Sequence, residues 1–295
     1  MLKRQRFGVE IEFTGISRGR AAEVIAQHFN SSVMLTRGSY DTRTIRDTQG
    51  REWKVMRDSS IRPQPTGDEF KVEVVSPILV YEDIEVIQEL LRRLRKAGAK
   101  ANNSCGIHVH IDGANHDAKS LKNIVNFFCS RQDLIYEALQ VDENRVRYCK
   151  KVSPELLKKI KAAKGITCND FETLWYSRAN HGYTGERGGR YNQTRYQGLN
   201  LHSFFHKGTV EFRMFNSTTH AGELKAYIQF CLAVSAWAIK STDRILFKKI
   251  GHYNPGQKTT IMDNVLIHRL NLVGDEFKTA RLHLTSHLKE AAAAA

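Results

Sequence analysis

The chain has 295 residues, 41% hydrophobic and 26% charged, which is ordinary for a soluble globular protein with a sizeable core. Lys and Arg outnumber Asp and Glu by 45 to 31, and the resulting net charge of +14 favours anionic partners: phosphorylated molecules, acidic peptides or nucleic acid. The five dispersed cysteines, the absence of an apolar leader and the lack of a run long enough to span a bilayer argue against disulfides, secretion and membrane insertion, so we expect a cytoplasmic protein.

The first predicted element is a β-strand over residues 7–13, in which apolar and polar residues alternate. Every second residue from Phe7 to Phe13 is apolar, whereas Glu10 and Glu12 lie together on the opposite face. Two neighbouring carboxylates repel each other and cost free energy to bury. Water would solvate them on an edge strand, but in a central strand they require a cation, for which a divalent metal ion is a candidate.

The next 60 residues predict one helix and two strands. Ser17 is a suitable cap for a helix that runs to about Phe29. Residues 31–50 lack apolar periodicity, so we expect a loop or short irregular strands there. Residues 53–58 and 70–75 predict two strands, the second with Glu73 on its polar face.

A second strand with regular alternation covers residues 106–112, after an amphipathic helix predicted from Asp83 to Gly98. Its polar face carries His108, His110 and Asp112. Taken alone, a His-x-His pair on a strand is weak evidence for a metal ligand. Its value depends on which other polar faces lie beside it.

The middle of the chain combines helices with an unusual loop. We predict helices at 120–139, 154–165 and 171–176. The loop that follows, Ser177–Gly198, contains five glycines and four arginines: Arg178, Arg187, Arg190 and Arg195. Such a segment suits phosphate or carboxylate capture, but it also suits a disordered basic insert, and its composition does not decide between them.

The last predicted part of the sheet is a hairpin of residues 199–206 and 209–215, with a turn at Lys207-Gly208. Its expected polar face holds Asn200, His202, Glu211 and Arg213. Helices are predicted for 223–240 and then, as two or three segments, to about residue 290. We expect one domain over residues 1–290, with the alanine run 291–295 outside the fold.

Taken together, the polar faces are rich in carboxylate and imidazole: Glu10, Glu12, Asp58, Glu73, His108, His110 and Glu211, with Arg213 beside them. Each residue singly fits the solvated face of an antiparallel sheet. As a set they suit Mg²⁺ or Mn²⁺ better than Zn²⁺, because oxygen ligands predominate. His202 and His206 have the spacing of a helical zinc pair, which the predicted strand argues against.

Five segments, in order, resemble the amidoligase family: Gly8–Phe13, Val72–Pro77, Cys105–His110, Leu199–Leu201 and Thr209–Arg213. That family is a branch of the carboxylate–amine ligases and is similar in its catalytic barrel to glutamine synthetase and glutamate–cysteine ligase. The resemblance covers about residues 7–240. It implies an α+β fold in which an antiparallel sheet curves into a half-barrel backed by helices, with a helical C-terminal region.

The resemblance also implies roles for individual residues. One metal ion would be held by Glu10, His108 and Glu211, and a second by Glu12, Glu73 and Asp58. The sequence departs from the family at the second metal site. Relatives have two well-placed carboxylates in the hairpin that contributes to it, whereas here only Glu73 is clear. The remaining implied contacts are Arg213 with the phosphates, and His110, Asn200 and Arg195 with substrate or nucleotide.

The implied chemistry uses ATP and Mg²⁺, or Mn²⁺, to phosphorylate a carboxylate, after which an amine attacks the acyl phosphate. The carboxylate would belong to an acidic peptide, a protein or a cell-wall precursor, and the loop 177–198 would recognise it. Two other functions fit the charge: a metal-dependent nuclease and a non-catalytic nucleic-acid-binding protein. We do not expect a nucleic-acid partner, since no element carries a dense basic stripe with interleaved aromatic residues.

Overall fold

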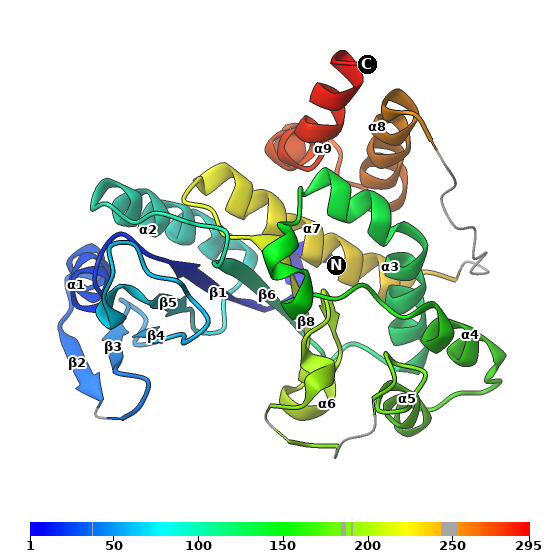
Figure 1. Ribbon diagram of the computed structural model, residues 1–295, viewed down its shortest axis with the longest axis horizontal. Coiled ribbons are helices and arrows are strands. Elements are labelled where there is room, and N and C mark those ends of the chain that lie inside the picture. The colour runs from blue at the N-terminus through cyan, green and yellow to red at the C-terminus, as the bar shows by residue number, and fades with distance from the viewer. Residues whose placement is uncertain (37, 184–186, 190, 243–252) are drawn as a thin grey trace.

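The computed structural model describes the chain except for residues 37, 184–186, 190 and 243–252 (Figure 1). Its centre is an open eight-stranded antiparallel sheet with the order β2-β3-β4-β5-β1-β6-β8-β7. The strands are β1 (Phe7–Phe13), β2 (Val33–Thr36), β3 (Thr42–Arg46), β4 (Glu52–Met56), β5 (Val72–Val75), β6 (Gly106–Asp112), β7 (Leu199–Asn200) and β8 (Thr209–Asn216). The predicted combination of an antiparallel sheet with helices is confirmed.

Strand β1 lies in the middle of this sheet, between β5 and β6. In the register of these strands, Glu12 pairs with Glu73, and Glu10 pairs with His108. Strand β8 continues the sheet on the other side of β6, where Glu211 pairs with His110. Because side chains alternate between the two faces of a strand, these pairings bring the carboxylates and imidazoles onto one face.

The helices are α1 (Arg18–Phe29), α2 (Ile84–Lys96), α3 (Ala118–Ala138), α4 (Pro154–Ala162), α5 (Cys168–Trp175), α6 (His202–Lys207), α7 (Ala221–Lys240), α8 (Pro255–Asn264) and α9 (Lys278–Ala293). Several begin at a side-chain cap, as predicted: Ser17 accepts a hydrogen bond from the backbone of Arg20, and Ser153 from that of Leu156. Helix α9 continues into the alanine run as far as Ala293, beyond the predicted end near residue 290.

The apolar face of the sheet packs against the helices (Figure 1). From β1, Val9 and Ile11 are 2% and 3% exposed and belong to one continuous core with residues of α2, α3 and α7. Helix α9 packs on α7 and α3, and helix α8 packs on α9 and α3. Within the described residues, no helix has the length and apolarity needed to cross a bilayer.

The predicted strand over residues 199–206 is wrong, because only its first two residues are extended. Residues 202–207 form α6, and Gly208 ends this helix with a φ of 74° and donates to the carbonyls of Phe204 and Ser203. A glycine in the left-handed conformation is a typical helix terminator, although its place in the sequence also suits a hairpin turn. The prediction that His202 shares a strand face with Arg213 is therefore wrong. Asn200 does lie in the sheet, where it pairs with Glu211.

The polar segment 31–50 contains two strands, β2 and β3, which pair with each other. Every residue of β2 is exposed, so neither face required apolar residues and no alternation marked it in the sequence. These strands extend the sheet beyond β4 and form one wall of the cavity described below.

Candidate active site

The polar face of the central strands is buried. The exposed fractions are 5% for Glu12, 8% for Glu73, 4% for His108, 3% for Glu211 and 7% for Arg213. A solvated sheet face, the simpler explanation of each residue, is therefore wrong for this group. Buried charges need compensating partners, so the contacts among them decide what the site can do.

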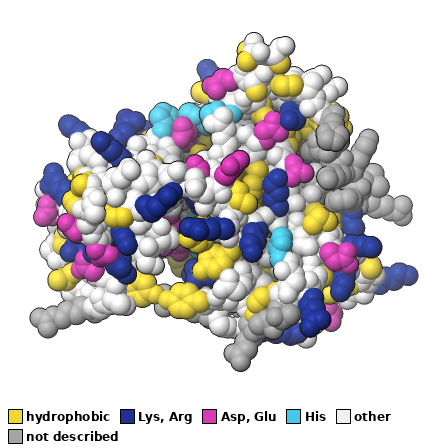
Figure 2. All heavy atoms as spheres, in the orientation of Figure 1, with side chains coloured by type: hydrophobic (Ala, Val, Ile, Leu, Met, Phe, Trp, Pro, Cys, Tyr) yellow, Lys and Arg dark blue, Asp and Glu magenta, His cyan; other side chains and the backbone are white. Residues whose placement is uncertain are grey.

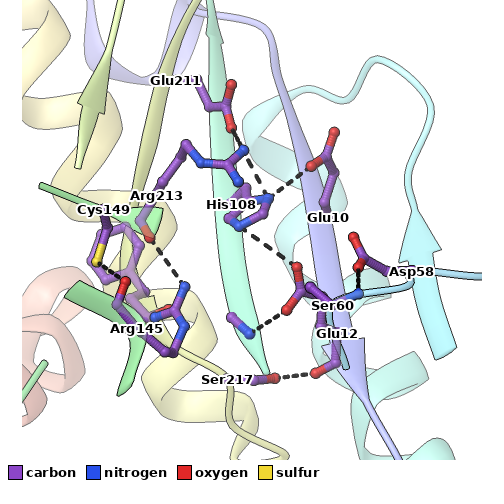
Figure 3. Close-up of polar contacts among 12 residues, drawn as sticks. Glu10, Glu12, Asp58, Ser60, His108, Arg145, Cys149, Glu211, Arg213 and Ser217 are labelled. Carbon is purple, nitrogen blue, oxygen red and sulfur yellow. Dashed lines mark hydrogen bonds and ion pairs between the residues drawn. The ribbon is translucent and has the colours of Figure 1, made fainter. Parts of the chain in front are cut away.

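His108 lies between the two carboxylates of β1 (Figure 3). Its Nδ1 is 2.8 Å from Oε2 of Glu10, and its Nε2 is 3.7 Å from Oε1 of Glu12. The other oxygen of Glu12 accepts the backbone N–H of Gly106 at 2.6 Å. Two residues further along β6, Nε2 of His110 is 3.2 Å from Oε1 of Glu10. Each β1 carboxylate is thus oriented by an imidazole or a backbone amide of β6.

Strand β8 adds an ion pair to this group (Figure 3). Arg213 donates from Nη1 to Oε1 of Glu211, and Asn200 donates from Nδ2 to Oε2 of Glu211 at 2.7 Å. Oε1 of Glu211 is also 3.9 Å from Nε2 of His110. Glu211 is therefore held between Arg213 and Asn200, which lie on β8 and β7.

Three overlapping sets of side chains have the composition of a metal site. In each set, one ligand atom per residue lies within 4.8 Å of the others: Glu10, Glu73 and His108; Glu10, His110 and Glu211; Glu12, Asp58 and Glu73. Asp58 comes from the segment after β4 and supplies the second carboxylate beside Glu73. Mostly oxygen donors with one imidazole fit Mg²⁺ or Mn²⁺.

Hydrogen bonds and positive charges stabilise the ionised form of two of the carboxylates, Glu10 and Glu211. Burial favours the protonated form of Glu10, but His110 and His108 outweigh it and hold the pKa of Glu10 well below its usual value. For Glu211 too, burial is outweighed, chiefly by Arg213 and then His110, and its pKa falls to about 2. Glu10 and Glu211 are therefore carboxylates near neutral pH.

The other two carboxylates lack sufficient positive charge. Burial, and then the charge of Asp58, raises the pKa of Glu12 to about 7. Burial also raises the pKa of Glu73 well above its usual value, with contributions from Glu10, Glu12 and Asp58. This half of the site has more negative charge than its side chains compensate, which is the electrostatic condition a bound cation would satisfy.

The histidines differ in charge. Burial and the nearby Arg213 lower the pKa of His108 to about 4, so its ring is neutral and has a lone pair for a ligand. For His110, burial is outweighed by Glu211 and Glu10, which raise its pKa. His110 is therefore the imidazole that more readily carries a proton.

A cavity of about 850 Å³ is lined by Glu10, Glu12, Glu73 and Glu211 and by His108. Basic side chains line it as well: Lys54, Arg57, Arg145, Arg195 and Lys207. Figure 2 shows Lys and Arg side chains spread over one face of the molecule, including its centre. The cavity is thus lined both by carboxylates and by basic side chains, an arrangement that suits a metal–phosphate ligand.

The C-terminal part of the loop 177–198 contributes to the lining of this cavity. Arg195 lies over the rings of Tyr191 and Tyr196, 5.7 and 5.8 Å from their centroids, and all three line the cavity. The hydroxyl of Tyr191 also contacts that of Tyr40, which lies between β2 and β3. Arg187 instead donates to Thr173 at 3.3 Å, and Arg190 is outside the described residues.

Arg145 is a site residue that the sequence did not indicate. It is 3% exposed and lies in the 3₁₀ turn Glu143–Tyr148, from which it donates to the carbonyls of Phe215 and, at 3.2 Å, Arg213 (Figure 3). Gly106 makes room for it, since a Cβ there would be 2.0 Å from Nη2 of Arg145. No local pattern distinguishes this arginine from its exposed neighbours.

His202 also lines the cavity, but from α6 rather than from a strand. Its Nδ1 is 2.6 Å from the hydroxyl of Tyr176, and its buried Nε2 has no hydrogen-bond partner among the described residues. Burial, and then the charge of His206, lowers its pKa to about 4, so the ring is neutral. The sequence singled out His202, although on the wrong element.

One family matches this chain over most of its length. The model of the family described as "Putative amidoligase enzyme" matches residues 3–235. The chain belongs to this family. A search of the curated proteins finds no significant match.

Membership confirms the predicted family and indicates a ligase-type function. The match includes all eight strands and therefore all the carboxylates and imidazoles described above. Helices α8 and α9 of this amidoligase-family chain lie beyond the matched residues.

Proposed function

We propose that this chain is an ATP- and Mg²⁺-dependent carboxylate–amine ligase that forms an amide or isopeptide bond. One observation carries the proposal: the side chains of three overlapping carboxylate and imidazole sets lie together, and most of them line a cavity that also holds Arg213 and further basic side chains. Ligation through ATP requires this pairing of cation ligands with phosphate ligands, and it requires no Ser or Cys nucleophile.

The residues fit two adjacent divalent cations. Glu10, His108 and Glu211 would hold one, and Glu12, Glu73 and Asp58 the other, with His110 an alternative ligand for the first. Support comes from the raised pKa values of Glu12 and Glu73, which reflect uncompensated negative charge. When bound, such ions neutralise phosphate charge and polarise the transferred group.

Arg213 is the residue we assign to the phosphates. It lines the cavity and its guanidinium is positioned by Glu211, since Nη1 is bonded to that carboxylate. The rest of the fork remains for an anion, and Nε of Arg213 has no partner in the described part of the chain. Arg195 and Asn200, which also line the cavity, would contact nucleotide or substrate.

The reaction would proceed in two steps. A carboxylate oxygen of the substrate attacks the γ-phosphorus of ATP, the bond to the β-phosphate oxygen breaks, and ADP leaves. The amine nitrogen then attacks the acyl carbon, phosphate leaves with the bonding electron pair, and the amine loses a proton. Positioning and charge neutralisation by the residues above provide most of the catalysis of the first step.

His202 would add a hydrogen bond to this process. Its Nδ1 is the partner of the Tyr176 hydroxyl, and donation by that hydroxyl places the ring proton on Nε2. A buried N–H without a partner costs free energy until an acceptor arrives. We therefore assign the Nε2–H of His202 to an oxygen of the carboxylate substrate or its acyl phosphate.

The family resemblance extends the proposal to the fold and the setting. The sheet would correspond to the half-barrel of glutamine-synthetase-like enzymes, in one domain over residues 1–290, working in the cytoplasm. The net charge of +14 favours an acidic acceptor, such as an acidic peptide, a protein or a cell-wall precursor. The loop 177–198 would close over it.

The decisive experiment is a screen for substrate-dependent ADP release. Purified protein is incubated with ATP, Mg²⁺ and panels of amino acids and acidic peptides, and products are analysed by mass spectrometry. We expect ADP and phosphate only with the correct carboxylate, and with an amine a product lighter by one water than the two substrates together. Glu10→Gln should abolish this, whereas Glu85→Gln, on the exposed side of α2, should not.

Two outcomes would contradict the proposal. Release of AMP and pyrophosphate would exclude the acyl-phosphate route. Mg²⁺- or Mn²⁺-dependent cleavage of DNA or RNA that Glu10→Gln abolishes would instead identify a nuclease, and tight binding without cleavage at physiological salt would identify a nucleic-acid-binding protein.

A further inference from the structure

A second group of potential ligands lies outside the cavity, where α7 and α9 meet. His220 caps the N-terminus of α7, Glu223 is in its first turn, and His283 lies on α9. One ligand atom from each lies within 4.8 Å of the others. His220 is exposed, and Glu223 and His283 are half-buried, so the group is open to solvent.

The two imidazoles are close neighbours. Their ring centroids are 4.9 Å apart, with an angle of 63° between the planes. With Glu223, they place one ligand atom each within 4.8 Å of the others, so both rings are close enough to contribute to one site.

The cap of α7 determines which nitrogen of His220 is free of a proton. Nδ1 of His220 accepts the backbone N–H of Glu223 at 3.2 Å. Nδ1 must therefore carry a lone pair, and in a neutral ring the proton is on Nε2. This tautomer is also the one that coordinates a metal ion through Nδ1. The hydrogen bond is long, so the cost of replacing it with an ion is small.

Gly222 leaves the space between the two rings open. A Cβ at this position would be 2.8 Å from Nε2 of His283 and 3.3 Å from Nδ1 of His220. Both nitrogens therefore border the same small space, which exists because residue 222 has no side chain. Any larger residue would fill the position toward which the two ligands converge.

We propose that His220, Glu223 and His283 form a binding site for a Zn²⁺-like transition-metal ion that fastens α9 to α7. Two nitrogens and one carboxylate oxygen are the donors that Zn²⁺ prefers, in contrast to the oxygen-rich cavity. Ligands of a tetrahedral zinc ion are roughly 3.4 Å apart, so small side-chain rotations would close the set. His220 and Glu223 lie within residues 3–235, whereas His283 on α9 lies beyond them, so the site would join the family segment to the C-terminal helix.

The test is metal titration of the full chain after chelator treatment. Wild-type protein is titrated with Zn²⁺ by calorimetry and with Co²⁺ by visible absorption, which reports tetrahedral coordination. We expect one bound ion to be lost, or its affinity to fall by about tenfold or more, in His283→Ala and Glu223→Gln. Zn²⁺ should raise the Tm of the wild type more than that of either variant.

Three further variants separate coordination from folding. His220→Ser removes the ligand but keeps a good helix cap, and Gly222→Ala blocks the space while improving helix propensity, so both should fold and lose the ion. His287→Ala removes a histidine of α9 outside the set and should change nothing. Equal stoichiometry and affinity in wild type, His283→Ala and Gly222→Ala would overturn the proposal, as would an equal loss in His287→Ala. Metal binding is measured without any ligase assay, so the result tests this site independently of the proposed ligase function.

Discussion

Glu12 and Glu73 are direct partners across strands β1 and β5, and both side chains are buried on the same face of the sheet. Among the described residues, neither forms an ion pair with a Lys or Arg side chain, and Asp58 lies beside them. The fold therefore brings together groups that destabilise one another until protons or a cation compensate their charge.

We expect Glu12→Gln to stabilise the metal-free protein at neutral pH. Glutamine resembles the protonated carboxyl and can still accept the N–H of Gly106. Since folding raises the pKa of Glu12 from 4.5 to about 7, its contribution to stability is present in full below pH 4.5 and is lost as the pH rises through 7. The variant should match the wild type near pH 4 and exceed it by up to roughly 3 kcal/mol at pH 8.

Denaturant unfolding at several pH values, with and without Mg²⁺, measures this difference. Mg²⁺ should stabilise the wild type and have little effect on Glu12→Gln or Glu73→Gln. A loss of stability in the metal-free Gln variants, together with unchanged Mg²⁺-ATP binding, would show that these carboxylates are structural.

We expect Arg213→Lys to keep Mg²⁺-ATP binding within a few-fold of the wild type but to lower kcat by about 100-fold or more. A lysine ammonium can replace the contact with Glu211, but it cannot at the same time present a planar fork to a phosphate. Steady-state kinetics with the substrate found in the screen provides the measurement. Arg92→Lys on α2 is the matched control, and near-normal turnover of Arg213→Lys would exclude a role for the fork.

We expect Gly106→Ala to destabilise the protein by roughly 1–3 kcal/mol, because the new Cβ would lie 2.0 Å from Nη2 of the buried Arg145. Gly8→Ala is the matched control on the neighbouring strand, where the nearest atom would be 3.7 Å away. Thermal unfolding should show a large decrease in Tm for the first variant and a small change for the second. Equal effects would mean that general strand propensity, rather than Arg145, is responsible.

His202→Ala should lower kcat/KM by about tenfold, and His202→Gln should recover part of it, because the glutamine amide can place an N–H near the position of Nε2. Tyr176→Phe removes the partner of Nδ1 and should weaken the preference for the Nε2–H tautomer. Full activity of His202→Ala would show that its unpaired nitrogen does not contact substrate.

Much of the site was predictable because its residues alternate with apolar ones on strands that are themselves regular. The alternation of β1 and β6 predicts both strands with the bounds that the structure has, and it predicts the face on which Glu10, Glu12, His108 and His110 lie. Periodicity alone does not say that β1 is central, so it left open whether this face was solvated.

The remainder depends on tertiary contacts that no local pattern records. Arg145 enters the site from a 3₁₀ turn because Gly106, 39 positions earlier, leaves room for it. Helix α6 could not be distinguished from a strand, since six residues are too few for the two periodicities to differ clearly. Strand β2 is fully exposed, so it requires no apolar pattern, and β3 is short and contributes one apolar residue, Ile45, to the core.

The central place of β1 has a consequence for how the protein folds. This strand precedes both of its neighbours along the chain: β5 and β6 lie about 60 and 100 residues later, so β1 is synthesised before either of them. Pairings of such large sequence separation close long loops and form slowly. We therefore expect Glu10 and Glu12 to remain in water until β5 and β6 have been synthesised. Their carboxylates then meet the other acidic side chains late in folding, when charge repulsion opposes the last strand pairings. A divalent cation present at that stage would speed the closure of the sheet.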